Sequence, residues 1–329
     1  MAIQKSVDDE ADEFIFSDSL KKSADKGDLQ SQYRMGIVYR LGLGVDKDIS
    51  ESMKWLKKAC NRNSTPAQIE LGRIYEEGKD VERDYLEAAI LYKKAVEKGD
   101  PEGMWRLGIM YYKGIGLNQD FPKAFQLFSD AAEKDHARSQ NVIGCMHCKG
   151  QGIPYNQEVA LEWYRKAADQ GYARAQCNMG ITCELGIGQG RDMSSAIEWY
   201  KKAAEQGDKR AQCNLGFTYE VGIGQEKDLR AAAELYRMSA DQGYARAQCN
   251  LGFMYDNGLG VDENHVIAAD LYRRAADQGY ARAQCCLGLS HYGGRGVVRD
   301  LPAARWLLER AAEQGDDFAR EQLNILPWE

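Results

Sequence analysis

Glycine recurs every 36 residues along almost the whole of this 329-residue chain. One series comprises Gly36, Gly72, Gly108, Gly144, Gly180, Gly216, Gly252 and Gly288. A second has the same period: Gly27, Gly99, Gly171, Gly207, Gly243, Gly279 and Gly315, with Asn63 and Asp135, residue types that tolerate left-handed backbone, in its two gaps. Eight copies in phase, without an insertion, predict a stack of repeated structural units rather than separate domains.

Each repeat has the pattern of two helices joined by a glycine turn. In one copy, helix A is predicted over Ala173–Leu185 and ends at the turn Gly186-Ile187-Gly188. Asp192 then has the position of an N-cap, and helix B continues to a second glycine stop at Gly207. The same cap position recurs in every repeat: Asp48, Asp84, Asp120, Asn156, Asp192, Asp228, Asn264 and Asp300. The small residues should let the two helices approach closely, with aromatic side chains between the repeats.

Composition and charge exclude several classes of protein. The formal net charge is -7, so no basic face is expected for nucleic acid. Hydrophobic residues make up 44% of the chain, which argues against disorder, and no run approaches the ~20 apolar residues of a membrane span. The acidic stretch after Met1 lacks the apolar segment of a secretory signal. If Met1 is the native start, we expect a cytoplasmic protein without membrane insertion.

The repeat resembles the SEL-one-like repeat family, a tetratricopeptide-like group. The resemblance rests on A-x-x-x-L-G-x-x-Y-x-x-G-x-G-V/Q-x-x-D-x-x-x-A-x-x-W/L-Y-x-K-A-A-x-x-G, which is most complete at Ala211–Gly243 and Ala247–Gly279 and extends over about residues 17–324. It implies an all-α fold, a right-handed α-solenoid of about eight helix-turn-helix repeats. We expect an acidic tail at 1–16, a capping helix at 17–27, one continuous solenoid at 28–315 and a C-terminal cap and tail at 316–329.

The resemblance also implies a concave groove lined by the A helices, in which equivalent positions form ladders of arginine, aromatic and acidic side chains. Such a groove suits a protein or peptide partner, because aromatic and arginine side chains dominate binding interfaces. The expected contact residues are Tyr33, Arg40, Arg73, Trp105, Tyr112, Arg138, Arg174, Arg210, Phe217, Arg246, Phe253, Arg282 and Tyr292. We therefore expect a monomeric, non-enzymatic scaffold or adaptor without a cofactor.

The arginine ladder has a purely structural alternative. Each arginine could pair with an acid at the end of the preceding B helix, for example Arg174 with Asp169 or Arg210 with Glu205. The string Gly-Tyr-Ala-Arg-Ala-Gln-Cys is identical at 171–177, 243–249 and 279–285, which makes the C-terminal half generic. The N-terminal half varies most at the expected groove positions, so partner specificity is predicted there.

Nine cysteines raise the question of disulfides, metal or redox chemistry. Four of them, Cys177, Cys213, Cys249 and Cys285, recur with the repeat, and packed helices ~8–10 Å apart place such residues beyond disulfide reach. Reduced thiols are therefore expected. A zinc site would need Cys145, His147, Cys148 and Cys183 to converge, and a rigid helix splays the first three apart. Small buried side chains are the simpler interpretation, with His147 and His291 in the core. A thiol-based metal or redox module stays the alternative.

The last alternative is a hydrolase. Ser19 and Lys22 fit the spacing S-x-x-K, and cysteine-rich relatives of the resembled family are described as penicillin-binding or β-lactamase-like. The sequence has no accompanying Lys-Thr-Gly or Ser-Asp-Asn motif, no P-loop and no nucleophile elbow. The glycine pairs follow helices rather than strands, so they form turns and not phosphate cradles. The prediction is that the protein is not an enzyme.

Overall fold

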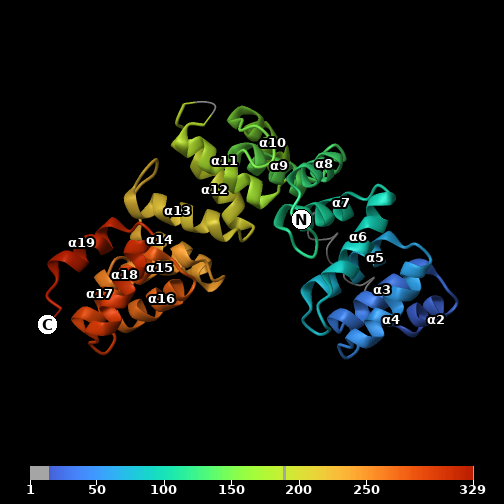
Figure 1. The fold of residues 1–329 in the computed structure, drawn as a ribbon, viewed down its shortest axis with the longest axis horizontal. Helices are drawn as coiled ribbons and strands as arrows, with labels where there is room; N and C mark the ends of the chain where they lie inside the picture. Colours follow the sequence, from blue (N-terminus) through green and yellow to red (C-terminus); the bar gives the residue numbers. More distant parts are fainter. Residues whose placement is uncertain (1–14, 188–189, 329) are drawn as a thin grey trace. The chain divides into compact units, whose positions relative to one another are not determined.

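The computed structural model describes residues 15–187 and 190–328 and contains eighteen α-helices there, with no strand in these ranges (Figure 1). The all-α prediction is confirmed. Most of the predicted acidic tail, residues 1–14, and Gly188 of one predicted turn lie outside the described residues.

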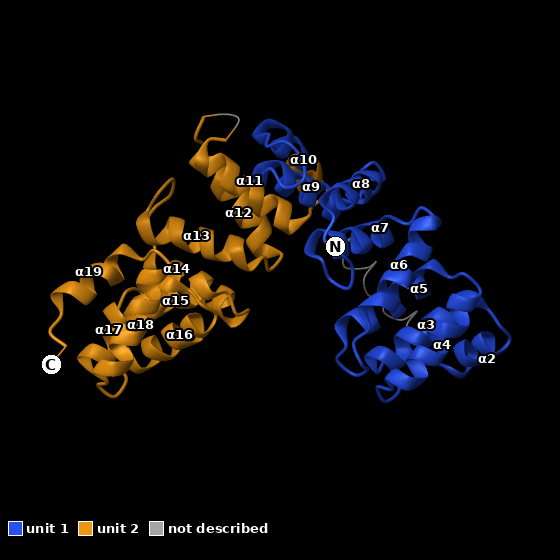
Figure 2. Cartoon of the chain, in the orientation of Figure 1, with its two compact units in different colours: residues 1–163 blue, residues 164–329 orange. Residues whose placement is uncertain are grey.

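The chain divides into two compact units, residues 1–163 and 164–329 (Figure 2). The boundary lies inside one helix, α10 (Gln157–Asp169). The other helices of the first unit are α2 (Asp18–Asp25), α3 (Leu29–Leu41), α4 (Ile49–Asn61), α5 (Thr65–Glu77), α6 (Tyr85–Glu97), α7 (Pro101–Lys113), α8 (Phe121–Ala132) and α9 (Ala137–Lys149).

The second unit continues with the same alternation. Its helices are α11 (Ala173–Leu185), α12 (Met193–Glu205), α13 (Lys209–Val221), α14 (Leu229–Asp241), α15 (Ala245–Asn257), α16 (His265–Asp277), α17 (Ala281–Gly293), α18 (Leu301–Glu313) and α19 (Asp317–Ile325). From here on, the odd-numbered helices α3 to α17 are called A helices, and the even-numbered helices α4 to α18 are called B helices.

The start and stop signals of the helices act as their sequence predicts. Helix α11 has the predicted bounds and ends at Gly186, whose φ of 70° is in the left-handed region. Helix α12 begins after Asp192, whose carboxylate accepts a hydrogen bond from the Ser195 amide at 3.0 Å. Asn63 and Asp135, which replace glycine after two B helices, have φ values of 63° and 57°. The glycine series that begins at Gly27 therefore marks the ends of helices.

The core of each repeat is a large B-helix side chain packed on an A-helix glycine. A Cβ atom at Gly180 would lie 2.4 Å from the ring of Tyr200, so only glycine permits this approach. The equivalent rings of Tyr92, Tyr236 and Tyr272 are fully or almost fully buried. Burying a side chain of this size stabilises the fold by about 1.5–3 kcal/mol. The close A–B packing that the small residues predict is confirmed.

A buried glutamine links each of several A helices to the B helix before it. The Gln212 side-chain amide donates to the Ala204 carbonyl at 3.3 Å and so satisfies the end of α12. The same bond, from glutamine to an alanine carbonyl eight residues earlier, recurs at Gln32, Gln140, Gln176, Gln248 and Gln284. These bonds fix the packing of one repeat on the next without depending on any exposed residue.

Two expectations about individual residues are wrong. His147 and His291 are only half-buried and do not belong to the core. Their Nδ1 atoms lie 3.3 Å from the Pro154 carbonyl oxygen and 3.2 Å from the Val298 carbonyl oxygen. The rings therefore lie at the loop between the A and B helices, where a polar side chain has a backbone partner.

None of the helices in the described part of the chain combines the length and apolar character needed to cross a bilayer.

Candidate functional site: the A-helix faces

All thirteen sequence-predicted contact residues lie on A helices. Those in the first unit are Tyr33 and Arg40 on α3, Arg73 on α5, Trp105 and Tyr112 on α7, and Arg138 on α9. Those in the second unit are Arg174 on α11, Arg210 and Phe217 on α13, Arg246 and Phe253 on α15, and Arg282 and Tyr292 on α17. The two sets differ in what their arginines contact.

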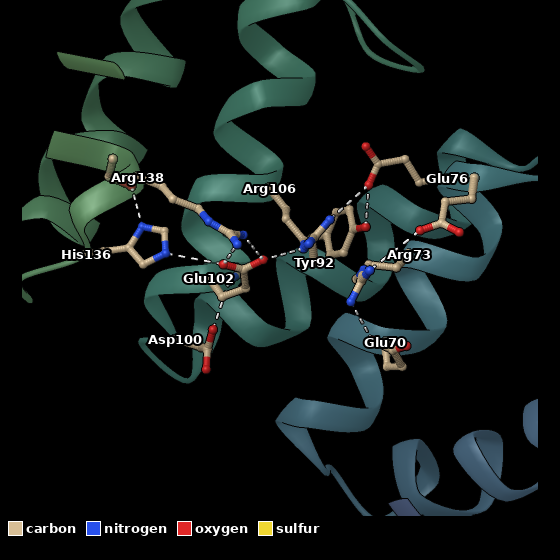
Figure 3. Close-up of polar contacts among 12 residues, drawn as sticks. Glu70, Arg73, Glu76, Tyr92, Asp100, Glu102, Arg106, His136 and Arg138 are labelled. Carbon is tan, nitrogen blue, oxygen red and sulfur yellow. Dashed lines mark hydrogen bonds and ion pairs between the residues drawn. The ribbon is translucent and has the colours of Figure 1, made fainter. Parts of the chain in front are cut away.

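In the first unit, Arg40 and Arg73 share two glutamates. Arg40 forms ion pairs with Glu70 and with Glu77, the latter at 3.1 Å between Nη2 and Oε2. Arg73 lies 3.2 Å from Glu70 and 3.7 Å from Glu77 (Figure 3). Both cations are therefore neutralised by acids of α5.

The same unit has a second cluster around Glu102, at the start of α7 (Figure 3). Its carboxylate lies 2.8 Å from Arg106 Nε, 3.2 Å from His136 Nε2 and 3.5 Å from Arg138 Nη1. Burial alone would raise the pKa of Glu102, but the His136 hydrogen bond and the two arginines outweigh burial and lower this pKa to about 2. Glu102 is thus ionised and fully engaged within the fold.

The aromatic residues of the first unit are also in contact with their own chain. The guanidinium groups of Arg106 and Arg138 lie 5.4 and 5.2 Å from the Trp105 ring centroid. Tyr112 packs edge-on against Phe121 at 5.4 Å and hydrogen-bonds Gln151. Tyr33 is half-buried and packs against the core of the first repeats.

In the second unit, the arginines contact neutral partners except at one position. Arg174 Nε lies 3.0 Å from Asp208 Oδ2. Arg210 and Arg246 each donate a hydrogen bond of 3.4 Å to an asparagine of the preceding A helix, Asn178 and Asn214. The expected pairs with Asp169 and Glu205 are wrong, because those two acids are exposed on B helices while the arginines turn towards neighbouring A helices.

A hollow of about 230 Å³ lies among α11, α13 and the start of α15. Its polar lining comprises Arg210, Arg246, Asn214, Tyr244 and Glu184. Its apolar lining is Ile181, Leu185 and Phe217. The Arg246 guanidinium lies 5.9 Å from the Phe217 ring centroid, so Arg246 forms a cation–π contact with Phe217 at the edge of the hollow.

The remaining predicted residues of the second unit are nearer its C-terminal end. Phe253 is 45% exposed on α15, the highest value among the aromatic residues predicted for contact in this unit. Arg282 lies 5.0 Å from the Phe318 ring, and Tyr292 packs edge-on against Trp328 at 5.6 Å. Arg282 and Tyr292 therefore contact side chains of the terminal helix and the segment after it.

The cysteines, the candidate metal ligands and Ser19, on which the redox, metal and hydrolase alternatives depend, show no arrangement that favours those functions among the described residues. None of the nine cysteines, all within the described ranges, forms a disulfide. Burial raises the pKa of Cys177, Cys213 and Cys285 to about 12, so these thiols stay protonated. Among the residues with described positions, no three histidine, cysteine or acidic side chains meet in a way that could hold a metal ion. The Ser19 hydroxyl lies 2.9 Å from that of Ser17 on exposed α2.

The predicted contact residues include three residues that line the hollow, Arg210, Phe217 and Arg246, whereas its other lining residues and Glu102 are not among them. Tyr244 directly precedes α15, and Asn214 lies on the preceding A helix, α13. Both residue types recur at the 36-residue period, as Tyr172 and Tyr280 and as Asn178 and Asn250. That recurrence was a usable signal. Glu102 gave none, because its equivalent in the following repeats is arginine.

The fold and these faces define a helical repeat protein of the tetratricopeptide-like kind. The Sel1 repeat family model matches residues 29–64, 65–100, 101–136, 137–172, 173–208, 209–244, 245–280 and 281–316. The chain therefore belongs to the Sel1 repeat family. The eight matched segments coincide with the A–B pairs of the structure, so the resemblance inferred from the repeat pattern is confirmed.

Solved structures support this assignment. The chain is similar to c5321, described as a protective antigen present in uropathogenic Escherichia coli strains displaying an SLR fold, with 34% identity, a TM-score of 0.63, and coverage of 93% of this chain and 73% of that one. It is also similar to a Sel1 repeat protein from Oxalobacter formigenes, with 30% identity, a TM-score of 0.62, and coverage of 94% and 90%. No curated protein matched in a sequence comparison. Sel1 and related repeat folds generally serve as protein–protein interaction scaffolds, and the family is typically non-enzymatic.

Proposed function

We propose that this protein is a monomeric, non-enzymatic scaffold that holds a peptide or protein segment on its A-helix faces. The hollow among α11, α13 and α15 carries the proposal, because it brings two arginines, a tyrosine and a phenylalanine of two successive repeats to one place. Arginine and aromatic side chains are the residue types that contribute most to binding at protein interfaces.

The contacts within the repeats support the assignment of roles. Packing between helices depends on buried glycines, rings and glutamines, whereas Arg210 and Arg246 each form a hydrogen bond of 3.4 Å to an asparagine. A half-exposed side chain such as Phe253 is therefore available to a partner at little expense to the fold.

Peptide selection followed by mutation tests this proposal. Peptides from a random phage-displayed library would be selected on the full chain, synthesised with a fluorescent label and titrated by anisotropy. We expect Phe217→Ala with Phe253→Ala to weaken their binding by about tenfold or more, since hot-spot aromatics are each worth at least ~1–2 kcal/mol. A second variant, Trp105→Ala with Tyr112→Ala, tests the face of the first unit.

A matched control uses exposed apolar residues of a B helix. Val266 and Ile267 on α16 are 67% and 40% exposed, and Val266→Ala with Ile267→Ala should leave binding unchanged. Selected peptides that bind both A-helix variants as wild type does, but lose affinity for the B-helix variant, would refute the proposed groove.

A further inference from the structure

Four arginines occupy the same A-helix position in consecutive repeats of the second unit: Arg174, Arg210, Arg246 and Arg282. Within residues 164–187 and 190–328, only Arg174 of these four has an ion-pair partner. Unpaired like charges in neighbouring positions disfavour the fold. In the first unit the equivalent position holds Gln30, Pro66, Glu102 and Arg138, and Glu102 forms an ion pair with Arg138 at 3.5 Å.

Arg210 and Arg246 both line the hollow and retain most of their hydrogen-bonding capacity. Each has a single bond of 3.4 Å to an asparagine oxygen, whereas a guanidinium carries five N–H donors. Tyr244 lies close enough to both arginines for each to lower its pKa, although burial dominates and raises that pKa, so the phenol keeps its proton as a further donor. Donors for an anion therefore converge from α13, α15 and the turn before α15.

One acid, Glu184, also lines the hollow. Its Oε2 atom accepts a hydrogen bond of 2.6 Å from the Tyr200 hydroxyl, and no cation among the described residues lies within ion-pair distance of its carboxylate. Glu184 therefore does not neutralise Arg210 or Arg246 directly. Two cations face one acid that is already hydrogen-bonded, which leaves the hollow with an excess of positive charge.

We propose that this hollow is a subsite for the carboxylate of an acidic residue in a bound peptide segment, with an apolar neighbour of that residue against Phe217. The inference rests on the proposed scaffold function and specifies the chemistry of its partner. A carboxylate accepts paired hydrogen bonds from a guanidinium group, in the geometry that arginine favours. Ile181, Leu185 and Phe217 supply the apolar surface beside it.

The size of the hollow favours side chains of a peptide over a complete small molecule. Its volume of about 230 Å³ lies below the ~300–1,000 Å³ typical of small-molecule pockets. The recurrence of arginine at the same A-helix position of four successive repeats, from Arg174 to Arg282, also suits an extended chain that presents acids at intervals. With a net charge of -7, the protein has no general attraction for anions, so recognition depends on this local arrangement.

Fluorescence anisotropy on the full chain tests the subsite. The probe is a fluorescein-labelled peptide of alternating glutamate and phenylalanine, compared with the same peptide carrying glutamine or lysine in place of glutamate. We expect the acidic peptide to bind at least about tenfold more tightly than the glutamine peptide, and added salt to reduce that preference. Arg210→Gln with Arg246→Gln should abolish the preference.

The matched control changes the net charge equally at another place. Arg230 and Arg273 are exposed on the B helices α14 and α16, and Arg230→Gln with Arg273→Gln should retain the preference. If both double variants lost the preference for the acidic peptide equally, the proposed subsite would be wrong, because the preference would then reflect net charge alone. Equal binding of all three peptides, weakened by Phe217→Ala, would overturn the acid preference while supporting the proposed scaffold. If none of the three peptides bound, the proposed subsite would also be wrong. The library selection tests the scaffold function independently of this result.

Discussion

The two units of this protein place arginines on equivalent helices and use them differently. In the first unit, Arg40 and Arg73 have glutamate partners on α5, and Arg138 belongs to a second network with Glu102, Arg106 and His136. In the second unit, Arg210 and Arg246 contact asparagine and border a hollow. We infer from this difference that the glutamate-paired arginines of the first unit stabilise the fold, and we propose that Arg210 and Arg246 bind a ligand.

This contrast changes where partner specificity should be sought. Variation among the groove residues of the first unit favours that half by sequence, and that expectation stays untested. Its variable positions include acids that neutralise the arginines beside them. The second unit repeats the arginine, and two of its repeated A-helix acids, Glu184 and Glu220, accept hydrogen bonds from tyrosine hydroxyls and form no ion pair with a described residue.

Glu102→Gln should have the largest effect on the free energy of unfolding. It tests whether the contacts of Glu102 with Arg106, His136 and Arg138 stabilise the fold. The Glu102 side chain is 27% exposed and its pKa is held near 2, so removing its charge should cost about 2–3 kcal/mol of unfolding free energy at neutral pH. Urea unfolding followed by tryptophan fluorescence measures this cost. In the second unit, Glu309→Gln removes an exposed pair with Arg305 and should cost less than about 0.5 kcal/mol. Equal losses of unfolding free energy for Glu102→Gln and Glu309→Gln would contradict a special stabilising role of the Glu102 contacts.

The same carboxylate predicts a pH dependence. The folded pKa of Glu102 is depressed from 4.5 to about 2, so its contribution is complete above about pH 5 and is lost as the pH falls towards 2. The stability difference between wild type and Glu102→Gln should therefore shrink over this range, since both side chains become uncharged. A difference that stays constant from neutral pH to about pH 2 would contradict the assigned role.

Arg210→Glu would transfer the arrangement of the first unit to the second. Position 210 precedes Arg246 by one repeat, as Glu102 precedes Arg138, so the new acid should pair with Arg246. We expect a gain of about 0.5–1 kcal/mol in unfolding free energy, together with loss of binding to the acidic peptide. Thermal unfolding and anisotropy measure the two effects, with Arg230→Glu on the outer surface as control. Lower stability with unchanged binding would show that Arg210 serves the fold.

A further comparison concerns a tyrosine–glutamate hydrogen bond that is present in both units. The Tyr236 hydroxyl donates to Glu220 at 2.6 Å, and the Tyr92 hydroxyl donates to Glu76 at the same distance. Glu76 also has Arg106 at 3.4 Å, whereas Glu220 has no ion-pair partner among the described residues. Tyr236→Phe should therefore cost about 1 kcal/mol in chemical unfolding and Tyr92→Phe about half as much. A larger loss of unfolding free energy for Tyr92→Phe than for Tyr236→Phe would mean that the Arg106–Glu76 ion pair does not compensate for the lost hydrogen bond.

The architecture could be predicted from sequence because its signals are local and recur eight times. Gly186, Asp192 and Gly180 each act through the backbone or an adjacent helix, so position in the repeat is enough to predict a helix end, a cap or a close approach. The helix bounds of α11 followed directly from such signals. The A-helix location of the contact residues followed from the same periodicity.

The distinction between the two arginine sets could not be predicted in this way. It depends on side-chain directions between repeats, which decide that Arg174 meets Asp208 rather than Asp169 and that Arg246 meets Asn214. The half-buried positions of His147 and His291 escaped prediction for a related reason. The Val298 carbonyl that lies beside His291 belongs to a loop whose path is set by tertiary packing.

Arginine side-chain NMR provides the most direct test of the central claim that the second unit keeps its arginines available for a ligand. Nε–Hε signals, assigned with single Arg→Lys variants, would be followed during titration with the glutamate–phenylalanine peptide. We expect saturable shifts for Arg210 and Arg246, and unchanged signals for Arg106 and Arg138 in their glutamate network. Shifts confined to Arg106 and Arg138, or none at Arg210 and Arg246 at peptide saturation, would contradict it.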